Sequence, residues 1–210
     1  MTGNRQQRAR QQLRERIVAT ARRLFASEGY EAVTMRRIAA EIEYSPGTIY
    51  LHFPDKESLI KEVCETDFGE LAGRMVLLAG EKDPVERLRK AALAYFTFSL
   101  ANPNHYRVMF MSARPPIDPE SVRHDRHDPQ QDAYAFVRAT VAECIASGRF
   151  RAAFPDADLA TQLIWAALHG LISLRITPQY EGWIRWKPAK KSVAAMVDAL
   201  MHGFLEERQT

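Results

Sequence analysis

A residue with a short polar side chain, followed by proline, recurs along the sequence. The pair occurs at Ser45-Pro46, Asp83-Pro84, Asn102-Pro103 and Asp128-Pro129. A small polar side chain can accept a hydrogen bond from the free amides at a helix start, and proline suits the first helical position. Each pair therefore predicts the start of a helix. Between these starts the apolar residues recur every three or four positions, which is the period of a helix.

The same reasoning predicts an all-α chain of about nine helices. It adds helix starts after Pro54 and Pro155, another start at Pro188, and helix ends at Gly29 and Gly148. The predicted helices are residues 10–28, 35–42, 46–52, 55–80, 84–101, 103–112, 129–147, 156–176 and 188–207. Residues 112–128 are expected to form the longest loop.

The first three predicted helices have the pattern of a helix-turn-helix domain. Two short helices are separated by a tight turn, and a longer helix stands before them. Ala39 is small where two helices must cross closely, and Ile49 is the residue that the third helix can turn inward. We therefore expect residues 1–54 to form a three-helix DNA-binding domain and residues 55–210 to form a helical bundle.

Positive charge is concentrated at the N-terminus. The net charge is only +3, but residues 1–24 contain seven arginines and one glutamate. A basic end on a near-neutral chain favours an anionic partner such as nucleic acid. Arg5, Arg8 and Arg10 either contact phosphates or an adjacent minor groove, or form a solvated tail.

A long run of residues resembles the DNA-binding domain of the TetR family. The resemblance rests on Leu24-Phe25, Gly29-Tyr30, Thr34, Ile38-Ala39-Ala40-Glu41 and the unbroken segment Ser45–Leu59. It covers about residues 14–60 without a gap, which makes it more specific than a lone short motif. It implies a homodimeric transcription regulator that binds double-stranded operator DNA.

The resemblance also implies which residues meet DNA. It identifies residues 45–52 as the recognition helix, with Ser45, Pro46 and Gly47 nearest the base edges and Tyr44 at the turn. A helix N-terminus with small residues lets backbone amides approach phosphate. The remaining DNA-binding candidates, at or beside the phosphate backbone, are Thr34, Thr48, Tyr50, His52 and Lys56. Tyr50 can instead be a half-buried core residue, and Lys56 a solvated lysine.

Two positions depart from the family pattern. Glu43 occupies the turn position that glycine usually fills, and a left-handed backbone there would cost on the order of 1 kcal/mol. Pro46 stands where lysine or arginine is common, which removes one phosphate contact. These departures concern the turn geometry and the base contacts, and leave the expected fold unchanged.

The segment Trp165–Gly170 resembles the Trp-x-x-x-His-Gly signature of one C-terminal domain class in this family. Trp165 and His169 share a helix face, so they either line an effector cavity or pack in the core. Gly170 is expected at a close helix–helix contact, because glycine inside a helix otherwise costs about 1 kcal/mol. The candidates for binding a small apolar effector are Tyr95, Phe98, Tyr106, Phe110, Tyr134, Gln162, Trp165 and His169.

The last predicted helix carries apolar residues at helical spacing. With helix 156–176 it is expected to form a four-helix bundle across the two-fold axis of a homodimer, as the resemblance implies. An intramolecular core is the alternative. The expected dimer residues are Val193, Met196, Val197, Leu200, Met201 and Phe204.

Other classes of protein find little support. The sequence has no catalytic triad pattern, phosphate loop or paired carboxylates, so we expect no enzyme and no cofactor. Residues 124–128 hold two histidines and two aspartates but lie in a proline-rich loop, so we expect no metal site. Cys64 and Cys144 lack CxxC spacing and indicate reduced, buried thiols.

A cytoplasmic location is also expected. The N-terminus lacks the apolar segment of a secretory signal. Residues 159–176 form the most apolar stretch, which is expected to be too short and too polar to span a bilayer. The leading hypothesis is a repressor that a small apolar effector releases from a palindromic operator. The alternative is a DNA-binding regulator without such an effector, which is constitutive or controlled by a protein partner.

Overall fold

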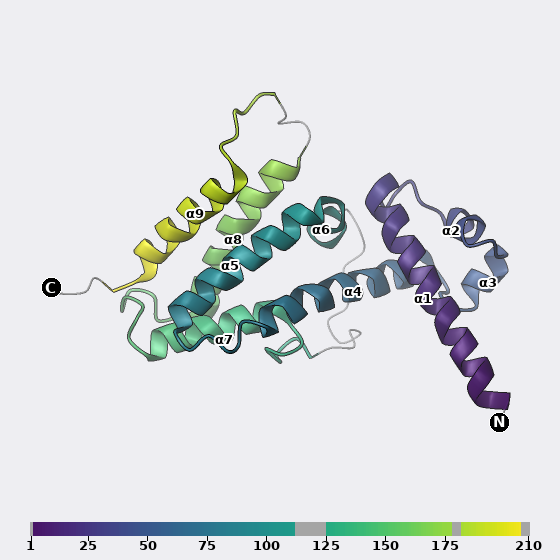
Figure 1. Cartoon of the computed structure of the whole chain (residues 1–210), viewed down its shortest axis with the longest axis horizontal. Helices are drawn as coiled ribbons and strands as arrows, with labels where there is room; N and C mark the ends of the chain where they lie inside the picture. The colour runs from purple at the N-terminus through teal and green to yellow at the C-terminus, as the bar shows by residue number, and fades with distance from the viewer. Residues whose placement is uncertain (1, 112–124, 178–181, 207–210) are drawn as a thin grey trace. The chain divides into compact units, whose positions relative to one another are not determined.

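The computed structural model describes residues 2–111, 125–177 and 182–206, and within these ranges the chain is all helical (Figure 1). The helices are α1 (Thr2–Glu28), α2 (Met35–Glu41), α3 (Pro46–Tyr50), α4 (Lys56–Val76), α5 (Pro84–Ala101), α6 (Pro103–Phe110), α7 (Ala133–Ala146), α8 (Ala157–Ile176) and α9 (Ala189–Phe204). The predicted all-α fold class is confirmed. Most of the predicted loop 112–128, including His124, lies outside the described residues.

Capping side chains start several helices where the sequence predicts them. The carboxylates of Asp55, Asp83 and Asp156 each accept a hydrogen bond of 2.7–2.9 Å from a backbone amide two or three residues later. Gly29 and Gly148 follow the ends of α1 and α7 with positive φ angles of 86° and 65°. These local signals set the helix boundaries because they satisfy amides and carbonyls that the helix itself leaves free.

One predicted helix start needs correction, and another, at Pro103, is confirmed without the expected side-chain cap. The Asp128 carboxylate accepts from the Gln130 amide at 2.8 Å and closes only a turn. Helix α7 begins at Ala133 instead, where Asp132 accepts from the Ala135 amide at 2.8 Å. Asn102 stands at the N-cap of α6, but its side chain makes no capping hydrogen bond.

The chain divides into two compact units, which are described separately. The first contains Met1–Phe68 and Asn102–Arg123, and the second contains Gly69–Ala101 and His124–Thr210. The division falls inside α4, later than the predicted boundary at residue 54. The reason is that Leu59, Ile60 and Val63 of α4 are buried in the same core as α1, α2 and α3.

The core of the first unit joins the three N-terminal helices to α4 and α6. Ile17 and Leu24 of α1, Ile38 of α2 and Ile49 of α3 are all almost fully buried. Asp67 of α4 is fully buried too, and its carboxylate accepts from Arg22 of α1 at 2.6 Å and lies 3.2 Å from His105 of α6. A buried carboxylate needs such partners, so this contact ties three helices together.

The second unit is a helical bundle in which α5 contacts α7, α8 and α9, and α8 contacts α7 and α9 (Figure 1). Helix α8 has 20 residues and a mean hydropathy of 1.3 over its most apolar window. By length and composition this helix is able to cross a membrane, so the prediction that the stretch is too short and too polar was wrong. The core helix of a soluble protein can have the same length and hydropathy.

Candidate nucleic-acid interface

Helices α2 and α3 are joined by a tight turn that is closed by backbone hydrogen bonds. The Glu43 amide donates to the Ala40 carbonyl at 3.2 Å, and the Tyr44 amide donates to the Ala39 carbonyl at 3.0 Å. Glu43 lies between these bonds with φ 61°, the left-handed conformation considered from the sequence. This is the Schellman arrangement, in which a left-handed residue ends a helix and satisfies its last carbonyls.

The N-terminus of α3 is held by Ser45. Its hydroxyl accepts from the Thr48 amide at 3.3 Å and lies 2.9 Å from the Thr48 hydroxyl, while Pro46 occupies the first helical position. Ile49 points inward and is fully buried. With the inner face fixed by Ile49 and the first turn fixed by Ser45, the opposite face of α3 is presented to solvent.

The exposed face of α3 and its preceding turn brings together most of the predicted DNA-binding residues. Those that are exposed to solvent are Tyr44, Ser45, Pro46, Gly47 and Tyr50. Tyr50 is 50% exposed, which argues against a simple core role. Sequence reasoning missed Leu51, which is 76% exposed at the end of α3. The sequence does indicate this exposure, because Leu51 follows the inward-facing Ile49 by two positions and so lies on the other side of the helix.

The remaining predicted contacts have partners of their own within the chain. The Thr34 hydroxyl accepts from the Arg37 amide at 3.1 Å and caps α2. The Lys56 ammonium lies 3.5 Å from the Glu31 carbonyl and 4.1 Å from the centre of the Tyr30 ring. Both residues lie in the same unit as α3, but the Lys56 ammonium must turn outward to reach a phosphate.

Arg14 of α1 fixes the chain that follows α3, and sequence reasoning missed this role. Its guanidinium donates to the His52 carbonyl at 2.9 Å and to Glu62 of α4 at 2.7 Å, and lies 4.1 Å from the centre of the Phe53 ring. These partners are 38 or more positions away in sequence, so no local pattern reveals them. Arg16 lies near the Tyr44 ring, at 5.7 Å.

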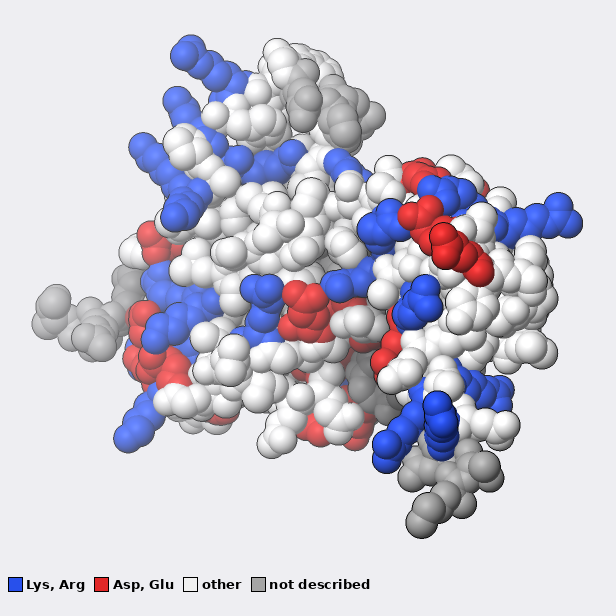
Figure 2. Space-filling view, turned by 45° about the vertical axis from the view of Figure 1, so that its right-hand side comes forward, with Lys and Arg blue, Asp and Glu red and all other residues white. Residues whose placement is uncertain are grey.

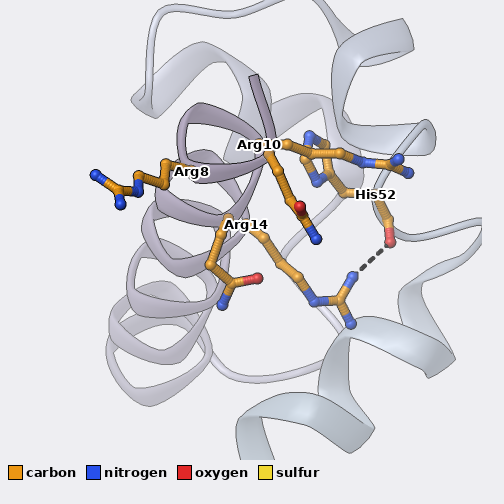
Figure 3. Close-up of a pocket in the computed structure, with 6 residues that line it drawn as sticks. Arg8, Arg10, Arg14 and His52 are labelled. Carbon is orange, nitrogen blue, oxygen red and sulfur yellow. Dashed lines mark hydrogen bonds between the residues drawn. The ribbon is translucent and has the colours of Figure 1, made fainter. Parts of the chain in front are cut away.

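A basic pocket lies between the N-terminal half of α1 and His52 (Figure 3). It is lined by Gln7, Arg8, Arg10, Gln11, Arg14 and His52, with a volume of about 500 Å³. Burial, Arg10 and Arg14 lower the pKa of His52 below its usual value of 6.5. Figure 2 shows blue basic side chains gathered beside the N-terminal end of the chain, at the lower right of the view.

Four of the predicted effector-binding residues form one aromatic cluster in the second unit. The Trp165 indole donates to the Tyr95 hydroxyl at 3.1 Å. The Tyr134 and His169 rings lie 6.3 Å and 6.0 Å from the Trp165 ring. Burial lowers the pKa of His169, which favours a neutral imidazole. The cluster joins α5, α7 and α8, and the Tyr134 and Trp165 side chains are partly exposed.

Of the other four effector candidates, two lie in the second unit and two in the first. Phe98 is fully buried below the Arg74 guanidinium, 5.4 Å from it, and Gln162 is exposed. Tyr106 and Phe110 belong to the first unit, where their rings lie 4.8 Å apart and Phe110 meets Phe68 edge to face at 5.5 Å. The structure therefore divides the predicted set between the two units.

The expected dimer residues all lie on α9 and differ in how deeply they are buried. Val193, Val197, Met201 and Phe204 are almost fully buried within their own chain, and Phe204 stacks on Phe150 at 5.3 Å. This corrects the expectation for these four residues, because a side chain buried in its own core offers no surface to a partner. Met196 and Leu200 are half-buried.

A capped, exposed α3 held against α2 by a tight turn, with a basic helix beside it, defines a helix-turn-helix DNA-binding protein. The comparisons with known proteins agree. Residues 17–63 match the model of bacterial regulatory proteins of the tetR family. Residues 88–200, more than half of the chain, match the tetracyclin repressor-like C-terminal domain. The chain belongs to the TetR family and is a DNA-binding transcriptional regulator, not an enzyme. The Trp-x-x-x-His-Gly class stays a prediction.

Two curated relatives illustrate how far the sequence likeness extends. An HTH-type transcriptional regulator of Bacillus subtilis, YerO, is 42% identical over 87 residues, covering 40% of this chain and 30% of YerO. The HTH-type transcriptional repressor AcnR of Corynebacterium diphtheriae is 40% identical over 76 residues, covering 36% and 38%. The chain thus spans about a third of the length of these relatives.

Solved structures share the fold along nearly the whole chain. A protein of unknown function from Rhodococcus sp. RHA1 superposes with a TM-score of 0.75 at 22% identity, covering 92% of this chain and 96% of that one. A TetR variant from Acinetobacter baumannii in complex with minocycline has a TM-score of 0.61 at 18% identity, covering 89% and 93%. At these identities the likeness concerns the fold.

Proposed function

We propose that this regulator is a repressor that binds a palindromic operator as a homodimer and is released by a small apolar effector. The observation that carries the DNA-binding part is the exposed face from Tyr44 to Tyr50, which Ser45 caps and Ile49 anchors. Its short side chains allow close approach to base edges, and Tyr50 offers a hydroxyl to phosphate. The relative AcnR is named a transcriptional repressor, which supports repression as the proposed effect on transcription.

The proposed dimer surface is the outward face of α8. Leu159, Leu163 and Leu174 are 49%, 44% and 42% exposed, and they align with Ala166 and Gly170 along one side of the helix. A side chain at Gly170 would meet nothing within 4 Å in its own chain, so this glycine makes no close contact there. We propose that a second protomer fills this space, with half-buried Met196 and Leu200 of α9 at the margin.

The proposed effector site is the aromatic cluster of the second unit. Tyr95, Tyr134, Trp165 and His169 offer flat apolar surfaces together with hydroxyl and imidazole groups, the mixture that small-molecule sites use. The minocycline complex of the Acinetobacter protein supports a ligand-binding role for this fold. A DNA-binding regulator of this kind works in the bacterial cytoplasm, at the nucleoid.

The proposed link between effector and DNA is α4. This single helix begins in the first unit and continues past Phe68 into the second, so a ligand that favours one position of the helix acts on the recognition helices. Ligand and DNA must then weaken each other's binding by the same factor, typically about 1–3 kcal/mol.

A ligand screen by thermal shift, followed by operator titration with each stabilising compound, tests this function. We expect at least one aromatic compound to stabilise the protein and weaken operator binding. His169→Gln should blunt that release without changing operator affinity in the absence of the compound. The matched control is His202→Gln, at an exposed position on α9.

Two outcomes would count against effector release. The first is a compound that stabilises the protein and leaves operator affinity unchanged. The second is the absence of any binding compound, which would favour the alternative of a constitutive or protein-controlled regulator.

A further inference from the structure

The segment between α8 and α9 brings basic and apolar side chains together at the surface of the second unit. Trp183 and Ile184 are 80% and 39% exposed. Residues 182–197 contain no aspartate or glutamate, and Glu181 before them lies outside the described residues. Figure 2 shows blue basic side chains projecting at its upper left, near the start of α9. We call residues 183–191 the basic-aromatic patch, and its exposed cations are Arg185, Lys187, Lys190 and Lys191.

Arg175, near the end of α8, holds the basic-aromatic patch in place. Its guanidinium donates to the Lys187 carbonyl at 2.7 Å and to the Ser192 hydroxyl at 2.6 Å, and lies 5.0 Å from the centre of the Trp186 ring. The Trp186 amide donates to the Ile184 carbonyl at 2.9 Å. Because these contacts fix the backbone of the segment, its exposed side chains are already presented at the surface, and a partner that binds them has less chain to order.

A partner that fits the basic-aromatic patch must offer negative charge and an apolar layer together. The phosphate backbone of DNA supplies the charge, but it gives an exposed aliphatic side chain such as Ile184 nothing to enter. The surface of an anionic bilayer supplies both, because its headgroups attract lysine and arginine while indole and aliphatic groups enter the boundary with the acyl chains. We propose that this patch binds the anionic lipid surface of a membrane, with Trp183 and Ile184 entering the headgroup boundary.

The proposed membrane contact is peripheral and reversible. Two apolar side chains and four cations form a small anchor, and such anchors hold a protein at a bilayer surface without spanning it. Because the attraction comes largely from exposed charges, it weakens as the salt concentration rises. The patch lies in the second unit, and its binding to lipid does not depend on the DNA-binding function proposed above.

The first experiment is cosedimentation of the full chain with lipid vesicles. The protein should bind vesicles of phosphatidylglycerol and phosphatidylcholine, and should not bind vesicles of phosphatidylcholine alone. The double variant Lys190→Gln/Lys191→Gln should weaken binding by about 25-fold or more, because each cation at an anionic surface contributes a factor of about five. The matched control is Arg5→Gln/Arg8→Gln, which removes two exposed cations of α1 and should bind nearly as the wild type does. Equal losses in the two double variants, or a wild type that binds no anionic vesicle, would overturn the proposal.

The second experiment asks whether Trp183 enters the bilayer. Brominated phosphatidylcholine in the anionic vesicles should quench the tryptophan fluorescence of the wild type. Trp183→Phe keeps an apolar ring and should still bind, but it should lose most of this quenching. Trp186→Phe is the matched control and should retain the quenching, because Trp186 is partly buried beside Arg175. Bound wild type without quenching, or quenching that persists in Trp183→Phe, would contradict the insertion of Trp183.

The third experiment separates a membrane from the other possible occupants of the basic-aromatic patch. Trp183→Ala should weaken vesicle binding and leave both duplex affinity and the sedimentation coefficient unchanged. A loss of duplex affinity with unchanged vesicle binding would assign the patch to nucleic acid. Conversion of a dimer to a monomer would show that a second protomer covers Trp183. Either of these two results would overturn the membrane assignment.

Discussion

The Tyr44 amide donates a hydrogen bond to the Ala39 carbonyl at 3.0 Å, and it does so across a glutamate in the left-handed conformation. Glu43 ends α2 where glycine would do so without steric cost, because an L residue in this conformation costs about 1–2 kcal/mol. The recognition helix is therefore positioned by a strained turn.

We expect Glu43→Gly to raise the free energy of unfolding by about 0.5–1 kcal/mol, since glycine removes the strain but loses more chain entropy on folding. Chemical denaturation of the two proteins measures the difference. Glu43→Ala keeps a Cβ and should therefore leave the free energy of unfolding without an increase. Equal stabilisation by glycine and alanine would show that the glutamate side chain, and not the backbone, is the source.

The sequence predicts this part of the molecule well because its signals are local. Ser45, Asp55 and Asp156 cap helices within three residues of themselves, and the left-handed position of Glu43 follows from its place in the turn. The resemblance to a family then assigns the exposed residues of α3 without any need for three-dimensional contacts.

The parts that sequence reasoning missed depend on distant contacts. Helical spacing shows that Val193 and Val197 share a face, but it does not show whether that face meets its own chain or a partner. Helix α8 is apolar on several sides, so its outward stripe through Leu163 has no distinct pattern. Arg14 reaches His52 across 38 positions, a contact that only the fold creates.

Changes at Tyr50 and Lys56 should weaken binding to the phosphate backbone of DNA. Tyr50→Phe removes the exposed hydroxyl, and Lys56→Ala removes the ammonium, so both should weaken binding about equally for all sequences. Lys56→Ala should also reduce the salt dependence by about 0.9 per protomer, because one fewer phosphate is neutralised by each protomer. Fluorescence titrations at several salt concentrations measure both effects. Unchanged DNA affinity in both variants would refute the proposed phosphate contacts of Tyr50 and Lys56.

Dimerisation should fail when a charge enters the outward stripe of α8. Leu163→Asp places an unpaired carboxylate in the proposed interface, where it has no partner. Sedimentation velocity should show a dimer for the wild type and a monomer for this variant. Leu77→Asp, at a position 83% exposed and outside the stripe, should remain dimeric. A monomeric wild type would contradict the proposed assembly.

Both cysteines should be inert in the native protein. Cys64 and Cys144 form no disulfide and are fully buried. Burial raises the pKa of Cys144 to about 12, so its reactive thiolate is scarce at neutral pH. A thiol reagent should label neither residue before unfolding and both after it. Rapid labelling of Cys64→Ser under native conditions would show that Cys144 is reached by solvent.

The central claim is that two copies of the α3 surface read DNA related by two-fold symmetry. Selection of bound duplexes from a random library by the purified protein, followed by sequencing, tests it most directly. The account predicts an enriched inverted repeat whose half-site centres lie about one helical turn, or a multiple of it, apart. Recovery of sequences with no motif, or with a single unrepeated half-site, would contradict it.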